Sequence, residues 1–66
     1  MVRFGQKVRS ERERNGLSQE ELASRAVVHR TYVGMIERAE KNIALANIEK
    51  ICKALGLSIR DFFKDF

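Results

Sequence analysis

Apolar residues along this chain recur at spacings of three and four, the period of helices that bury one face. Phe4 and Val8 form such a pair and predict a helix over about residues 3–14, which Gly16 would terminate. Glu11 stands where that face calls for an apolar residue and weakens it. A second stripe, closed by Gly56, predicts another helix with five apolar positions: Leu45, Ile48, Ile51, Cys52 and Leu55.

The central stretch predicts two short helices joined by a tight turn. Ser18 is a natural N-cap, and Glu21 three residues later completes a capping box for a helix over about 18–25. A further helix follows over about 29–37. The expected inward residues of the two helices are Leu22, Ala23, Ala26, Val28, Val33 and Ile36. The opposite face of the second helix is mostly polar, as a helix that enters a DNA major groove requires. The sequence therefore predicts a helix-turn-helix over about 18–37.

The C-terminal residues are too apolar for a free tail. Ser58 and Asp61 form a capping signal for a short helix, IRDFF. Some apolar residues here would complete the core, and the remainder would form a two-fold interface over about 57–66. The candidates for this dimer interface are Leu57, Ile59, Phe62, Phe63 and Phe66. The expected fold is all-α, with residues 1–66 as one domain.

Composition narrows the function only modestly. Thirteen Lys and Arg against nine Asp and Glu give a net charge of +4, a weak bias towards polyanions. The single cysteine excludes an internal disulfide and fits a reducing cytoplasm. No apolar run approaches the roughly 18 residues that span a bilayer, and the N-terminus lacks a signal-peptide core. One histidine and no recognisable carboxylate pair give no support for an enzyme, a metal site or a cofactor.

The run LSQEELASRAVVHRTYVGMIER resembles the helix-turn-helix of Cro/C1-type repressors, and KNIALANIEKICKALGLSIRDFF continues the match. The resemblance implies a compact five-helix, lambda-repressor-like domain. The Arg-Thr-Tyr and Lys-Asn-Ile segments look like those of controller proteins of restriction–modification systems. Such proteins are homodimeric regulators in the cytoplasm, bacterial or phage-encoded and nucleoid-associated. They bind operator DNA upstream of their own gene and repress or activate transcription from it. Four residues depart from the family pattern: Glu11, Val27 in place of the turn glycine, His29 in place of a Ser/Thr cap, and Ala39 in place of a glycine.

Candidate base-reading residues lie in the second helix of the motif. Arg30 could donate two hydrogen bonds to guanine, and the Thr31 methyl could meet a thymine methyl. Tyr32 could contact sugar or phosphate, or be a partly buried ring, and Met35 would lie at the edge of the interface. Gly34 costs helix propensity, which suggests that it permits close approach of DNA or of neighbouring protein.

Phosphate contacts are expected around this helix. The family resemblance implies one at Gln19, and a helix N-terminus attracts anions. His29 would be a cap or a phosphate neighbour. The resemblance also implies phosphate contacts in the loop and the start of the next helix, at Lys41, Asn42 and Asn47, and a solvated role is the alternative there. Arg38 could join these contacts.

Two further assignments concern charged residues. The family pattern implies a structural ion pair between Arg12 and Glu37. Glu20 has three candidate roles: it could orient Arg30, contact RNA polymerase, or be an ordinary solvated residue. The alternative function is that of an antitoxin whose main partner is a toxin protein, which a neighbouring toxin gene would reveal.

Overall fold

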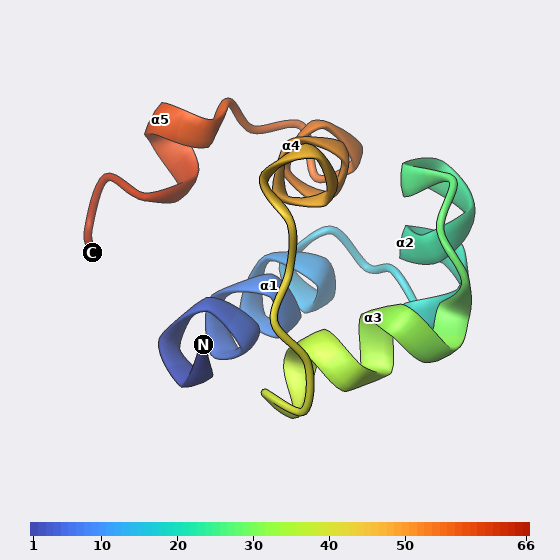
Figure 1. Ribbon diagram of the computed structural model, residues 1–66. Helices are drawn as coiled ribbons and strands as arrows, with labels where there is room; N and C mark the ends of the chain where they lie inside the picture. The colour runs from blue at the N-terminus through green and yellow to red at the C-terminus, as the bar shows by residue number, and fades with distance from the viewer.

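The computed structural model describes residues 1–66 and contains five helices and no strand (Figure 1). The helices are α1 (Val2–Arg14), α2 (Gln19–Ala26), α3 (Arg30–Glu37), α4 (Leu45–Ala54) and α5 (Ile59–Phe62). The predicted all-α fold is confirmed, and the predicted boundaries agree to within one residue. No helix has both the length and the apolar character needed to cross a membrane.

One apolar core holds the helices together. α2 packs on both α3 and α4, α1 packs on α3, and α4 packs on α5. The buried apolar residues are Phe4, Val8, Leu17, Leu22, Ala23, Ala26, Val33, Ile36, Ile51, Cys52, Leu55 and Phe62. They include most of the predicted inward positions, while Val28 and Ile48 are partly buried against the same core. The helical period thus identified the core face of four helices.

Two predicted positions need correction. Leu45, the first residue of α4, is 73% exposed and does not belong to the buried core. Phe62 is fully buried within the protomer, where its ring contacts Phe4 at a centroid distance of 5.2 Å. Phe62 is therefore a core residue and not part of a dimer interface as predicted.

The ends of α1 to α4 share one backbone geometry. Gly16, Val27, Ala39 and Gly56 have φ between 57° and 76° and follow the four helices in order. After α2, the Val28 N–H donates to the Ala23 carbonyl across this left-handed residue, as in a Schellman motif. Val27 and Ala39 adopt the left-handed conformation that glycine favours, so these departures from the family pattern leave strained turns.

Glu11 does not break the inner face of α1. Its side chain is 12% exposed and pairs with Arg14 at 3.6 Å and with Lys7 at 4.0 Å. The two cations satisfy a carboxylate that occupies a position expected to be apolar.

Candidate nucleic-acid interface

The N-terminus of α2 is fixed by a complete capping box. The Glu21 N–H donates to Ser18 Oγ at 3.0 Å, and the Ser18 N–H donates back to the Glu21 carboxylate at 2.8 Å. The hydrogen bond from the Ser18 backbone lowers the pKa of Glu21 below its usual value. The N–H groups at the start of α2 therefore point outward from a well-defined helix end.

The start of α3 is capped by an imidazole. The Thr31 N–H donates to His29 Nδ1 at 3.2 Å, so His29 fills the role that Ser or Thr has in the family pattern. Arg30 and Thr31 follow immediately in the first turn of α3, and both side chains are exposed. The cap thus sets the direction in which the two candidate base-reading residues leave the helix.

A polar hollow of about 570 Å³ lies between the starts of α2 and α3 and has no hydrophobic residue in its lining. It is lined by Arg12, Ser18, Gln19, Glu20, Arg30, Thr31, Gly34 and Arg38. The hollow therefore brings the base-reading candidates Arg30 and Thr31 together with the phosphate-binding candidates Gln19 and Arg38. Met35, Lys41 and Asn42 lie outside it.

Gly34 forms the floor of the polar hollow. A Cβ atom at this position would lie 3.0 Å from Arg38 Nη1 and 3.4 Å from Gln19 Oε1. The missing side chain lets these two polar side chains lie against α3. The close approach suggested by the sequence is thus made by neighbouring protein in this structure.

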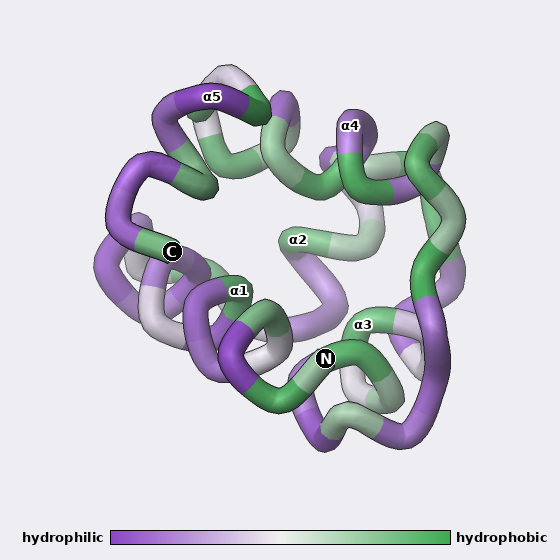
Figure 2. Tube along the Cα trace, turned by 60° about the vertical axis from the view of Figure 1, so that its left-hand side comes forward, coloured by the Kyte–Doolittle hydropathy of each residue, from purple (hydrophilic) through white to green (hydrophobic).

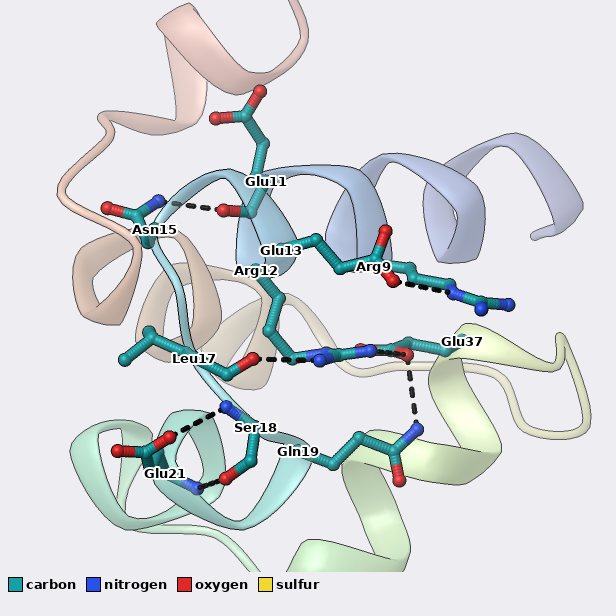
Figure 3. Close-up of polar contacts among 10 residues, drawn as sticks. All are labelled: Arg9, Glu11, Arg12, Glu13, Asn15, Leu17, Ser18, Gln19, Glu21 and Glu37. Atoms are coloured by element: carbon teal, nitrogen blue, oxygen red, sulfur yellow. Dashed lines mark hydrogen bonds and ion pairs between the residues drawn. The ribbon is translucent and has the colours of Figure 1, made fainter.

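A largely buried ion pair joins α1 to the end of α3 at the edge of the hollow (Figure 3). Arg12 donates to both carboxylate oxygens of Glu37, at 2.7 and 3.1 Å, and also to the Leu17 carbonyl at 2.8 Å. Gln19 Nε2 donates to Glu37 at 3.1 Å. The hydrogen bonds with Glu37 raise the pKa of Arg12. The structure thus places the predicted pair in contact and adds Gln19, whose amide is engaged with Glu37 while its backbone N–H stays at the helix start.

The other two arginines of the hollow also have carboxylate partners. Arg30 Nη1 lies 2.9 Å from Glu20 Oε2, so the two side chains are in contact, while the orienting role of Glu20 stays a prediction. Arg38 donates to Glu40 at 3.0 and 3.3 Å, and this pairing raises the pKa of Arg38. The sequence did not predict Glu40 as the partner of Arg38. The two residues lie two positions apart in a loop, and this spacing carries no periodic signal.

On the far side of α3, Tyr32 is partly buried against the core and its hydroxyl accepts a hydrogen bond from Asn47 Nδ2 at 3.1 Å. This contact ties α3 to the first turn of α4. Lys41 and Asn42 are exposed in the connection between these helices, which changes from hydrophilic to hydrophobic along its length (Figure 2).

An apolar hollow of about 510 Å³ lies where the two ends of the chain meet. Its lining residues are Met1, Val2, Arg3, Phe4, Ile48, Phe63 and Phe66. Arg3 donates to the Asp65 carbonyl at 3.3 Å and lies over the Phe66 ring. Leu57 and Ile59 are placed elsewhere, beside Cys52. Sequence reasoning missed Met1, Val2 and Ile48, because the fold alone brings them beside the C-terminal phenylalanines.

Comparisons with known proteins agree with this geometry. Residues 8–62 match the helix-turn-helix family. Control protein C.BamHI of Bacillus amyloliquefaciens is 52% identical over 59 residues, which are 88% of this chain and 73% of the relative. The restriction–modification controller protein C.AhdI of Aeromonas hydrophila superposes with a TM-score of 0.90 and 45% identity, over 94% of each chain.

A further similar structure is that of a nucleoprotein complex of C.Esp1396I, with a TM-score of 0.89 and 32% identity. It covers 96% of this chain and 82% of that one. The resemblance inferred from the sequence is confirmed, and the chain belongs to the helix-turn-helix family of restriction–modification controller proteins.

Proposed function

We propose that this protein is a transcriptional regulator that binds a palindromic operator as a homodimer and controls its own gene and that of a restriction endonuclease. The observation that carries the proposal is the polar hollow, in which the exposed first turn of α3 lies beside the N-terminus of α2. Membership of the controller family supports the same function.

In the proposed complex, α3 enters the major groove with its first turn towards the bases. Arg30 would donate two parallel hydrogen bonds to guanine O6 and N7, and the Thr31 methyl would contact thymine. The N-terminus of α2, including the Gln19 N–H, would hold a phosphate on one side of the groove.

The opposite side of the groove would be held by the connection between α3 and α4 and by the start of α4. Lys41 and Asn42 are exposed there and are the proposed phosphate contacts. Arg38 and His29 would add contacts, and Asn47 would do so after release from Tyr32. Met35 is partly buried, and we expect it to lie at the edge of this surface.

The second copy of the chain would dock on the apolar hollow at the chain ends. Phe66 and Val2 are 46% and 61% exposed in the single protomer, and burial on the partner would remove them from water. Such a dimer would set the two α3 helices roughly 34 Å apart, one turn of DNA. Leu57 and Ile59 would extend the contact only if the interface reaches the side of α4 that carries Cys52.

Bound at its operator in the cytoplasm, the dimer would exclude RNA polymerase from a promoter or assist it, according to the position of the site. The Glu20 carboxylate pairs with Arg30 but is 72% exposed, so Glu20 stays a candidate for a polymerase contact. The proposed function does not require that contact.

A gel-shift titration against the DNA upstream of the gene tests the proposal, with sedimentation of the complex giving its stoichiometry. We expect two protomers per palindrome and tight binding. Arg30→Ala should weaken operator binding by about 5- to 150-fold, the equivalent of one bidentate base contact. Arg9→Ala removes the same charge from the exposed outer face of α1 and is the matched control. Weak binding of equal strength to all sequences would overturn the proposal.

A further inference from the structure

The three arginines of the polar hollow are each paired with a carboxylate, so the charges within these pairs cancel although the chain carries +4. The pair of Arg12 with Glu37 is largely buried, and we expect it to be structural. The pairs of Arg30 and Arg38 are exposed, at 2.9 and 3.0 Å, and must adjust when DNA arrives.

The two exposed pairs use different edges of the guanidinium group. Arg38 donates to Glu40 from Nε and Nη2, which occupies the edge that forms paired hydrogen bonds. Arg30 makes a single hydrogen bond, from Nη1 to Glu20 Oε2. Its Nε and Nη2 donors have no partner in the protein, so Arg30 is held at one corner while its two-donor edge stays free.

We propose that Glu20 determines specificity by positioning Arg30, so that the free edge meets guanine while the Glu20 contact is kept. This inference rests on the proposed function and assigns a residue within it. At an operator guanine, the two parallel donors match O6 and N7 without loss of the carboxylate. On DNA that lacks this guanine, the bases offer the free edge no matching pair of acceptors, and Arg30 must leave the position that Glu20 gives it to turn towards a phosphate. The exposed Glu20 carboxylate then lies unpaired beside the negative backbone, which disfavours the wrong complex.

Glu20 is well placed to act in this way. It lies in the first turn of α2, where a helix N-terminus favours a carboxylate, and the capping box fixes that turn. The side chains of Glu20 and Arg30 are both exposed, so replacing Glu20 does not disturb the core. If Glu20 were instead an ordinary solvated residue, it would have no influence on the ratio of operator affinity to non-specific affinity.

The test measures the affinity of Glu20→Gln for the operator and for a scrambled duplex at one fixed salt concentration. We expect non-specific affinity to rise about two- to five-fold, the range of one exposed ion pair. Operator affinity should stay constant or fall, so the specificity ratio drops. Glu13→Gln is the matched control: it removes the same charge from an exposed pair with Arg9, and should leave the ratio unchanged.

Coupling to Arg30 separates positioning from a general charge effect. In an Arg30→Ala background, Glu20→Gln should no longer change the specificity ratio. The inference fails if Glu20→Gln alters the ratio no more than Glu13→Gln, or if its effect persists without Arg30. A wild-type protein that does not prefer the operator at all would instead refute the proposed function.

Discussion

Removing the Glu37 carboxylate should destabilise the whole fold. In Glu37→Ala, the Arg12 guanidinium keeps only the Leu17 carbonyl, and the Gln19 amide loses its acceptor. The Arg12 and Glu37 side chains are 12% and 4% exposed, so water cannot readily replace the lost carboxylate. Breaking a buried pair from one side costs about 3–5 kcal/mol, because the remaining charge is stranded.

That cost is large for a chain of this size. A typical stability per residue gives a 66-residue domain about 3–10 kcal/mol in total. Glu37→Ala should therefore lower the melting temperature by at least about 12 °C, and a large fraction of the variant could be unfolded at 37 °C. DNA binding should weaken at that temperature and recover on cooling or at higher protein concentration.

Thermal and urea unfolding followed by circular dichroism would measure this change, at one protein concentration because dimerisation adds to apparent stability. Glu13→Ala is the control, since it breaks an exposed pair and should cost less than about 1 kcal/mol. A Glu37→Ala protein that unfolds within about 1 kcal/mol of the wild type would refute the reasoning that this pair is structural.

Three further outcomes follow from other parts of the fold. Gly5→Ala should cost about 1–3 kcal/mol in urea unfolding, because a Cβ atom there would overlap the Ile36 carbonyl oxygen; an unchanged midpoint would contradict this close approach of α1 to α3. Cys52 is buried, and burial raises the pKa of its thiol, so a colorimetric disulfide reagent at pH 8 should label it only in urea; rapid labelling of native protein would count against this. The pKa of Glu21 is lowered in the folded state, so its contribution is present above the unfolded value and is lost as pH falls through the folded one. The difference in melting temperature between wild type and Glu21→Gln should therefore be largest near neutral pH and vanish in acid; a constant difference would show that the Ser18 contact is not the cause.

The fold was largely predictable because its determinants are local. The spacing of apolar residues and the capping residues together predicted the helices. Ser18 and Ser58 cap N–H groups only three residues away, and Gly16 lies just beyond the end of α1. The exposure of Leu45 was not predictable, because the periodicity of α4 does not say how far its neighbours extend.

The candidate site was predicted less completely. The positions of Arg30 and Thr31 follow from helix geometry, and both are exposed as expected. The bond between Gln19 and Glu37 and the pairing of Arg38 depend on side-chain directions that only the packed structure defines. The apolar hollow beside Val2 likewise exists only because the chain ends meet.

The left-handed Val27 and Ala39 on either side of α3 have a consequence for how this protein can evolve. The left-handed conformation of each residue lowers the stability of the fold by about 1–2 kcal/mol, and glycine would avoid this cost. The codons of valine and alanine both become glycine codons by a single base change. Val27 is also 82% exposed, so its side chain contributes little packing that such a change would lose. A change of Val27 to glycine, in the turn that leads into α3, would therefore stabilise the fold. That gain would offset destabilising substitutions that alter which DNA bases α3 contacts.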